Sequence, residues 1–246
     1  MMIAYTNRYE IKYLIETVRL PEVRAAIGGF FEPDANGDHD GTYINQSIYF
    51  DSPQYRFYRE KREGELVRIK PRIRLYRATE DGPAIGIFLE LKARYDRIVE
   101  KRRVPIDGDF AERILRPGPL DLTQREVENS VIGEFNYLCD RFALRPCVTV
   151  VYHRTALNGA FQQKLRVTFD QMNRCSLATT LDSPPDSLID SLPVTWFIME
   201  LKYNDRISEI LLQRLRSLGL QQQTLSKYAI AMEQGHDYFR RQITAS

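Results

Sequence analysis

The sequence lacks the features that mark several large classes of protein. No apolar run approaches the roughly 20 residues that span a bilayer, and the N-terminus has no secretory hydrophobic segment. The three cysteines form no CxxC pair, so neither a disulfide framework nor a zinc site is predicted. We therefore expect a cytoplasmic protein with no membrane segment.

The sequence also has little excess of one sign of charge over the other. The 35 Lys and Arg residues are nearly balanced by 33 Asp and Glu, which leaves a formal net charge of +2. This balance excludes the overall basic field that is typical of a non-specific nucleic-acid or membrane coat. The chain has no GxxxxGK phosphate loop, and its histidines (His39, His153, His236) are scattered, which argues against P-loop and histidine-based chemistry. Any anion-binding site must be local.

What the sequence does contain is alternation of apolar and charged residues from end to end. Alternation with period two predicts strands, and apolar spacing of three to four predicts helices, one of them capped on entry by Thr123. No Gly/Ser linker divides the chain, so we expect one α+β domain over residues 1–246. The expected strands are 8–13, 42–53, 70–78, 85–96, 97–106, 146–157, 164–171 and 196–203, the expected helices are 20–28, 55–64, 123–142, 207–218 and 225–234, and 178–193 is an expected loop.

The acidic segment 32–42 has the spacing of a calcium loop at Asp34, Asn36 and Asp38. However, His39 stands where such a loop requires glycine, and Asn45 replaces the closing bidentate glutamate. A solvated turn is therefore favoured over a calcium site.

The basic residues of the predicted strands repeatedly occupy positions of one parity, that is, alternate residues that fall on the same strand face. Residues two apart in a strand project from the same face, about 7 Å apart. If the apolar faces pack outward against helices, the charged faces meet inside a closed sheet, and a barrel of roughly eight strands has room there for one small ligand. The basic residues concerned are Arg8 and Lys12, Arg72 and Arg74, Lys92 and Arg94, and Arg154, Arg166 and Lys202.

Two interpretations of this pattern remain open at this point. Buried cations need compensation, and phosphate chains suit arginine forks and lysine point charges. On a half-exposed sheet, however, the same residues would face solvent and each Glu-x-Lys dyad would be a cross-strand ion pair. Periodicity alone does not indicate which face is inside.

Eight short motifs carry a resemblance to a known family. In order, they are RYEIKYLI, SIYFDSP, RIRLY, FLELK followed by EKRR, YHRTAL, LRVTFD, MELKY and SKYAIAM. They resemble the polyphosphate-polymerase domain of vacuolar transporter chaperone (VTC) proteins, and more closely its bacterial stand-alone members, over about residues 7–233. The wider group is the CYTH-like triphosphate tunnel metalloenzymes. This resemblance implies an α+β fold in which an antiparallel eight-stranded β-barrel encloses a basic tunnel, with flanking helices.

The resemblance also implies roles for individual residues. Glu200 matches the metal-binding glutamate, and Glu10 is the second metal candidate, with Mn²⁺ or Mg²⁺ as the implied ion. Arg8 stands where the founding ExExK motif has its first glutamate, which leaves the number of metals open. The residues implied to act on phosphates are Lys12, Arg72, Arg74, Lys92, Arg154 and Arg166, and further substrate contacts are implied for Arg8, Lys101, Arg103, Lys202 and Lys227.

The function that follows from the resemblance is transfer of the γ-phosphoryl group of ATP to a growing polyphosphate chain. The implied partners are ATP and polyphosphate or triphosphate, without nucleic acid. The alternatives are a tunnel triphosphatase, in which water replaces the phosphate acceptor, and a non-catalytic polyphosphate or inositol-phosphate binder. Nucleic-acid binding through exposed aromatics is weaker, because most of the 14 tyrosines lie on the apolar parity. The sequence gives no oligomeric state.

Overall fold

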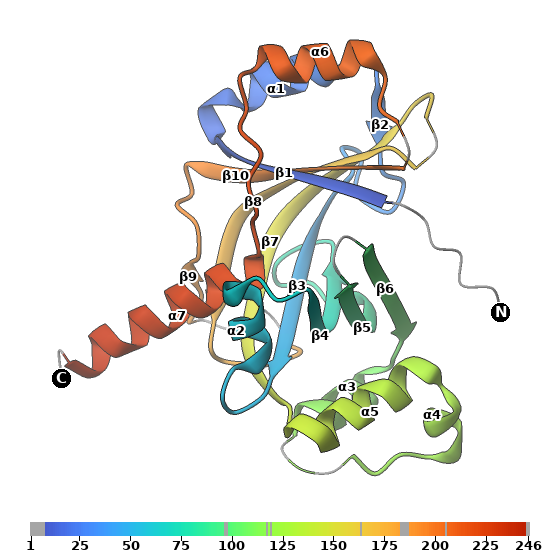
Figure 1. The fold of residues 1–246 in the computed structure, drawn as a ribbon, viewed down its shortest axis with the longest axis vertical. Helices are drawn as coiled ribbons and strands as arrows, with labels where there is room; N and C mark the ends of the chain where they lie inside the picture. The colour runs from blue at the N-terminus through green and yellow to red at the C-terminus, as the bar shows by residue number, and fades with distance from the viewer. Residues whose placement is uncertain are drawn as a thin grey trace. The chain divides into compact units, whose positions relative to one another are not determined.

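The computed structural model describes residues 8–95, 98–116, 118, 120–162, 164–182, 187–204 and 206–244, and the structural statements below concern these residues (Figure 1). The strands are β1 (Arg8–Glu16), β2 (Phe31–Pro33), β3 (Thr42–Asp51), β4 (Val67–Arg77), β5 (Ala84–Tyr95), β6 (Ile98–Pro105), β7 (Arg145–Gly159), β8 (Arg166–Ser176), β9 (Ile189–Asp190) and β10 (Trp196–Asn204). The helices are the 3-10 turn η1 (Thr17–Arg19), α1 (Leu20–Ile27), α2 (Arg56–Glu63), α3 (Gly108–Leu115), α4 (Gln124–Glu128), α5 (Ser130–Phe142), α6 (Glu209–Ser217) and α7 (Lys227–Thr244).

The strands form one ten-stranded sheet. Eight strands follow the order β1-β10-β8-β7-β3-β4-β5-β6, while the short strands β2 and β9 pair with β7 and β8 off this path. Each of the strand pairs whose register is resolved is antiparallel, including the predicted hairpin of β5 and β6. The predicted α+β class and the eight antiparallel strands are therefore confirmed.

The chain divides into two compact units, which we describe separately. Unit 1 contains Met1–Tyr43, Tyr152–Asn173 and Leu192–Leu225, and unit 2 contains Ile44–Val151, Arg174–Ser191 and Ser226–Ser246. The strands β3, β7 and β8 each pass from one unit into the other.

In unit 1, the helices α1 and α6 lie side by side over the apolar face of the sheet (Figure 1). Pro21 lies in the first turn of α1, where a backbone N–H makes no hydrogen bond within the helix, so its missing N–H costs nothing there. The core beneath the two helices consists of Ile15, Val23, Ile27, Leu165, Val167, Phe169, Phe197, Met199, Leu201, Leu211, Leu215 and Leu218. All of its strand residues are odd-numbered, so the apolar parity of the sequence is the face that the helices cover.

Unit 2 repeats this arrangement with different helices. The helices α3 and α5 pack against β5, and α5 also contacts β6. Ile73 of β4 and Leu89 of β5 are fully buried and directly opposite each other, and Phe135 of α5 is also fully buried. The predicted packing of apolar strand faces against helices is thus confirmed within each unit.

The predicted helix 123–142 is wrong in one respect, since it is two helices. Thr123 caps α4 through a capping box with Glu126, as its sequence position predicts. The backbone then becomes extended at Asn129, whose side chain accepts hydrogen bonds from the N–H groups of Val131 and Ile132 and so caps α5. In addition, the predicted loop 178–193 contains the two-residue strand β9, and α7 continues to Thr244.

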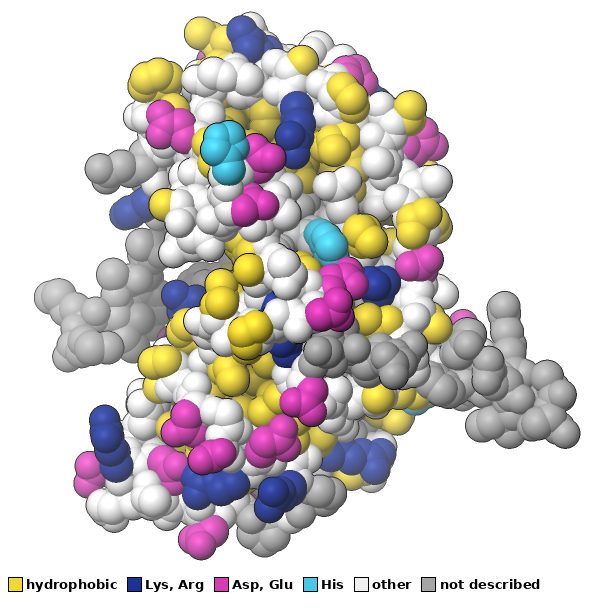
Figure 2. Space-filling view, turned by 180° about the vertical axis from the view of Figure 1, so that it is seen from behind, with side chains coloured by type: hydrophobic (Ala, Val, Ile, Leu, Met, Phe, Trp, Pro, Cys, Tyr) yellow, Lys and Arg dark blue, Asp and Glu magenta, His cyan; other side chains and the backbone are white. Residues whose placement is uncertain are grey.

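None of the described helices combines the length and the apolarity that crossing a membrane requires. On the face shown in Figure 2, basic and acidic side chains are mixed and do not form one basic field. This distribution agrees with the net charge of +2.

Candidate functional site

The charged residues of β1, β8 and β10 lie on one face of the unit 1 sheet. Lys12 is directly opposite Glu200, and Glu10 is directly opposite Lys202. Lys202 is in turn opposite Arg166 of β8. Residues directly opposite each other in antiparallel strands project from the same face. The register therefore brings five of the predicted site residues together.

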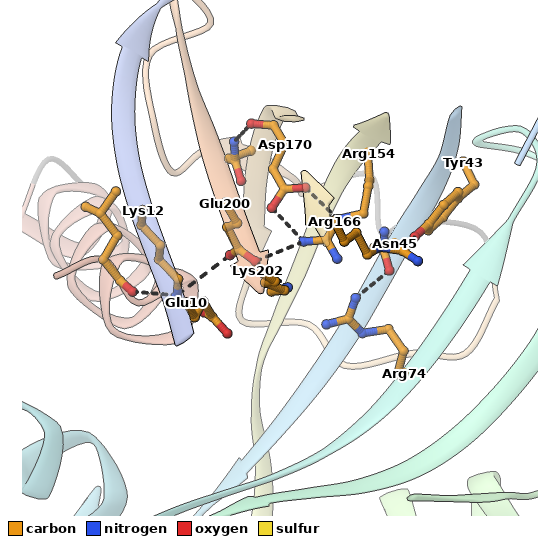
Figure 3. Close-up of polar contacts among 12 residues, drawn as sticks. Glu10, Lys12, Tyr43, Asn45, Arg74, Arg154, Arg166, Asp170, Glu200 and Lys202 are labelled. Carbon is orange, nitrogen blue, oxygen red and sulfur yellow. Dashed lines mark hydrogen bonds and ion pairs between the residues drawn. The ribbon is translucent and has the colours of Figure 1, made fainter. Parts of the chain in front are cut away.

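Glu200 lies at the centre of this arrangement (Figure 3). Its Oε2 is 2.7 Å from Nζ of Lys202 and 3.7 Å from a guanidinium nitrogen of Arg154, and its Oε1 is 3.7 Å from Nζ of Lys12. Nζ of Lys12 is also 3.0 Å from Oε1 of Glu10 and donates to the carbonyl of Leu225. Burial lowers the pKa of Lys202, although the Glu200 carboxylate opposes this shift. Lys12 therefore lies beside both predicted metal carboxylates.

Arg154 is held by a carboxylate that the sequence analysis did not predict. Its guanidinium donates two hydrogen bonds, of 2.6 and 2.7 Å, to the carboxylate of Asp170, whose side chain is fully buried. The guanidinium also lies 5.2 Å from the ring centroid of Tyr152. Asp170 ends the motif LRVTFD and shares the parity of Arg166, and this parity is the sequence signal that could have found it.

Arg166 has a similar partner in the acidic loop. It donates to Oδ2 of Asp34 at 2.5 Å and to the hydroxyl of Tyr43 at 3.1 Å. Burial acts to raise the pKa of Asp34, but hydrogen bonds from Asn36 and the charge of Arg166 outweigh it and lower this pKa. Asp34 therefore serves as a counterion of Arg166.

The loop itself has the structure of a self-capped turn. Oδ1 of Asp38 accepts hydrogen bonds from the N–H groups of Asp40 and Thr42, and Oδ1 of Asp34 accepts from Asn36. In the described part of the chain, no three His, Cys, Asp or Glu side chains are grouped to hold a metal ion. These contacts form the turn that the sequence analysis favoured, but Asp34 is buried against Arg166 and is not solvated.

Four cations and four carboxylates make up what we call the charged cluster of unit 1. Their formal charges cancel, so the chain's own carboxylates compensate these cations without a guest anion. The cluster consists of Lys12, Arg154, Arg166 and Lys202 with Glu10, Asp34, Asp170 and Glu200.

Unit 2 has its own charged face, on the side of β4, β5 and β6 away from the core. Arg72, Glu90 and Arg103 form one cross-strand row. Lys92 and Lys101 lie directly opposite each other in the next row. The register thus places four predicted basic residues around a single buried glutamate.

Glu90 is fully buried and is bound from two sides. Arg72 donates two hydrogen bonds to its Oε2, at 2.9 and 2.7 Å, and Nζ of Lys101 is 2.6 Å from its Oε1. Burial would raise the pKa of Glu90, but the charges of Arg72, Arg74 and Lys101 outweigh it and hold this pKa far below its usual range. Burial also lowers the pKa of Lys101 to about 7, with Arg72 adding to the shift and Glu90 opposing it.

The remaining predicted residues of unit 2 are Arg74 and Lys227. Arg74 donates to the side-chain carbonyl of Asn45 (Figure 3). Lys227 is the first residue of α7 and follows Ser226, whose hydroxyl accepts a 2.9 Å hydrogen bond from Lys70. Lys70 was not among the predicted site residues, although its parity matches theirs.

The structure therefore groups the predicted residues into two sets. Within unit 1 it brings together Glu10, Lys12, Arg154, Arg166, Glu200 and Lys202, and within unit 2 it brings together Arg72, Arg74, Lys92, Lys101 and Arg103, with Lys227 at the start of α7. The side chain of Arg8 lies outside the described residues, while its backbone is paired with Asn204.

Comparison with solved structures identifies the class of fold. The putative adenylyl cyclase HpAC1 from Hippeastrum, which is described as having a dominant triphosphatase activity, matches with a TM-score of 0.53 at 13% identity, over 92% of this chain and 97% of that chain. The PH1819 protein from Pyrococcus horikoshii OT3 matches with a TM-score of 0.47 at 17% identity, over 92% and 99% of the two chains. A putative adenylate cyclase from Bacillus halodurans matches with a TM-score of 0.49 at 11% identity, over 89% and 95%.

Sequence identities this low support a shared fold and nothing more. The match to HpAC1, with a TM-score of 0.53, supports the shared fold. The antiparallel sheet with its flanking helices is therefore the fold of the HpAC1 structure. The VTC domain family matches residues 7–236, so the chain belongs to the VTC domain family. A search of curated protein sequences finds no match.

Proposed function

We propose that this protein is a phosphotransferase that moves the γ-phosphoryl group of cytoplasmic ATP to the end of a polyphosphate chain. The observation that carries the proposal is the position of Glu200, which lies among Lys12, Lys202 and Arg154 on one sheet face. In the transfer, the bond from the γ-phosphorus to the β–γ bridging oxygen breaks and a bond to the terminal oxygen of the acceptor forms. ADP is the leaving group.

This chemistry depends on positioning and on charge neutralisation, and it needs no covalent nucleophile from the protein. In unit 1, Arg154 and Arg166 would bind phosphate oxygens while Asp170 and Asp34 hold their guanidinium groups in place. In unit 2, Glu90 orients Arg72 and Lys101 in the same way. Pre-oriented arginine forks lose less conformational freedom on binding, which favours tight and directional phosphate contacts.

The donor atoms near Glu200 fit a divalent metal ion that arrives with the substrate. Mg²⁺ is usually bound through one or two carboxylates together with waters and substrate phosphates. Glu10 and Glu200 supply such carboxylates, and directly opposite Glu200 the hydroxyl of Thr168 is buried with no hydrogen-bond partner among the described residues. When bound, Mn²⁺ or Mg²⁺ would draw negative charge from the transferring phosphoryl group.

The proposal is tested by incubating the protein with ATP and Mn²⁺ and resolving the products on a gel that detects polyphosphate. Long chains that accumulate together with ADP are the expected result. Free phosphate without chains would instead identify a triphosphatase, and tight triphosphate binding without turnover would identify a binding protein. Either of these two outcomes contradicts the proposal.

The triphosphatase alternative is favoured by the Hippeastrum protein, because it shares the fold and has a dominant triphosphatase activity. Against it, the first position of the ExExK motif is Arg8, so Glu10 is the one carboxylate that this motif supplies. Fewer carboxylates leave less capacity to bind metal ions and to activate a water molecule.

Binding of polyanions is predicted to weaken as the pH rises through 7. The pKa of Lys101 is lowered to about 7, so this side chain loses its charge above that pH and a bound anion must restore the proton. Because binding is coupled to the uptake of this proton, the affinity for the anion falls by at most about tenfold per pH unit. Isothermal titration with tripolyphosphate from pH 7 to pH 9 measures the effect.

The matched variant is Lys101→Arg, which stays charged throughout this range. Its affinity is expected to change less with pH than that of the wild type, because the ligand's own titration is common to both proteins. Identical pH profiles for the two proteins would contradict the assignment of this titration to Lys101.

A further inference from the structure

Three neighbouring positions of β3 place uncharged polar side chains on the charged face of unit 2. Ser47 is directly opposite Arg74 of β4, and Tyr49 is directly opposite Arg72. Residues directly opposite each other in antiparallel strands project from the same face, and so does Asn45, which precedes Ser47 by two residues. These three side chains were not among the predicted site residues, because the charge pattern of the sequence does not indicate neutral groups.

The outer two of these side chains hold the arginines of β4 in place. The hydroxyl of Tyr49 accepts a 2.9 Å hydrogen bond from Arg72. The side-chain carbonyl of Asn45 accepts a hydrogen bond from Arg74 (Figure 3). Because a guanidinium group only donates, this contact fixes which end of the Asn45 amide faces Arg74, and it leaves the two donors of Nδ2 for another acceptor.

Two polar atoms of this row are buried without a hydrogen-bond partner among the described residues. They are the hydroxyl oxygen of Ser47 and Nδ2 of Asn45, and both residues are fully buried. The large majority of buried polar atoms in proteins are paired, because an unsatisfied buried donor destabilises the fold. An alanine at position 47 would avoid this loss of stability. The two donors therefore indicate a ligand on this face.

The chemistry of these donors defines what they can bind. Nδ2 of Asn45 and the guanidinium group of Arg74 donate hydrogen bonds and do not accept them, so the ligand atom between them must be an acceptor and not a metal ion. A non-bridging phosphate oxygen accepts several hydrogen bonds and carries the negative charge that arginine attracts. Ser47 lies between Asn45 and Tyr49 on β3, that is, between the two side chains that orient Arg74 and Arg72.

We propose that Ser47 and Asn45 are ligands of the phosphoryl group that Arg74 binds, and that the Ser47 hydroxyl and Nδ2 of Asn45 donate hydrogen bonds to its non-bridging oxygens. The proposal rests on the proposed function, because it adds two uncharged ligands to the same site. Asn45 also holds Arg74, whereas the hydroxyl of Ser47 makes no hydrogen bond within the described residues. Ser47 is therefore the residue whose replacement tests the proposal.

The test is isothermal titration of the wild type and of Ser47→Ala with tripolyphosphate in buffer containing EDTA. The variant is expected to bind about tenfold more weakly, because a hydrogen bond to a charged acceptor is lost. The salt dependence of the affinity is expected to be the same for both proteins. Salt screens interactions between charges, and the contact that the variant loses comes from a neutral group.

Thermal unfolding of the ligand-free proteins separates ligand binding from a structural role. Ser47→Ala is expected to leave the melting temperature unchanged or to raise it, because it removes a buried hydroxyl that has no partner in the described part of the chain. If the alanine variant does not fold, Ser47→Cys has a similar shape and only a weak donor, and serves for the same measurements. The control is Ser130→Ala, which removes a hydroxyl from an exposed position at the start of α5 and leaves the affinity unchanged.

The proposal is overturned if Ser47→Ala binds tripolyphosphate as tightly as the wild type, or if its melting temperature falls together with its affinity. These measurements do not depend on turnover. A wild type that makes no polyphosphate while Ser47→Ala binds more weakly would contradict the proposed function alone. A wild type that makes polyphosphate while Ser47→Ala binds equally well would contradict only the role of Ser47 and Asn45.

Discussion

Replacing Arg154 with methionine is expected to abolish turnover and to lower the free energy of unfolding by about 3–5 kcal/mol. The loss of turnover, by about 10³-fold or more, follows because an arginine that stabilises a transferring phosphoryl group has effects of this size. The loss of stability follows because Asp170 is fully buried and Arg154 donates two hydrogen bonds to its carboxylate. Denaturant unfolding and ADP release measure the two effects.

The matched variant is Arg154→Met/Asp170→Asn, which removes both charges of the pair. Because no uncompensated carboxylate remains, this double variant should recover much of the stability that the single variant loses. Its turnover should stay as low as that of the single variant, because the guanidinium group of Arg154 that binds phosphate is still missing. Recovery of turnover together with stability would show that Arg154 only maintains the fold.

Replacing Glu200 with glutamine is expected to reduce turnover by about 100-fold and to weaken its dependence on Mn²⁺ or Mg²⁺. The variant keeps the shape of the side chain but removes a negative charge that lies beside Lys12, Lys202 and Arg154. Triphosphate binding in EDTA should be retained or become tighter, because these three cations lose a competing carboxylate. Turnover as a function of metal concentration, together with binding in EDTA, checks both parts.

A suitable control is Glu209→Gln on α6. Glu209 is also a glutamate of unit 1, but its side chain is 65% exposed and its ion-pair partner is Arg216. This variant should keep the turnover and the metal dependence of the wild type. An unchanged metal dependence in the Glu200 variant would contradict its assignment as a metal ligand.

The strand pattern of this protein could be predicted well because it depends on short-range periodicity. Arg72 and Arg74, or Lys12 and Glu10, are two residues apart, so strand geometry alone places each pair on one face. The sequence also indicates which face carries charge, and the core residues Phe169 and Met199 lie on the opposite parity, as expected. The prediction missed the short elements β2, α3 and β9 and the break at Asn129. The side chain of an asparagine can bond to nearby backbone N–H groups and so interrupt a helix, and the period of the apolar residues does not reveal this.

The partners of the site residues could not be predicted in the same way. Asp170 is 16 residues from Arg154, and Asp34 is 132 residues from Arg166. Neither carboxylate follows a spacing rule, because strand order and register decide which residues are neighbours across a sheet. The same is true of the row formed by Lys70, Lys92 and Lys101.

The α+β class, the parity of the charged residues and the family resemblance follow from the sequence alone, because each depends on local periodicity or on short motifs. How the charges are balanced depends on the tertiary structure. In unit 1, Glu10, Asp34, Asp170 and Glu200 neutralise the cations, whereas in unit 2 Glu90 is bound between Arg72 and Lys101. The physical reason is that electrostatic energy depends on distances between side chains, and register sets those distances.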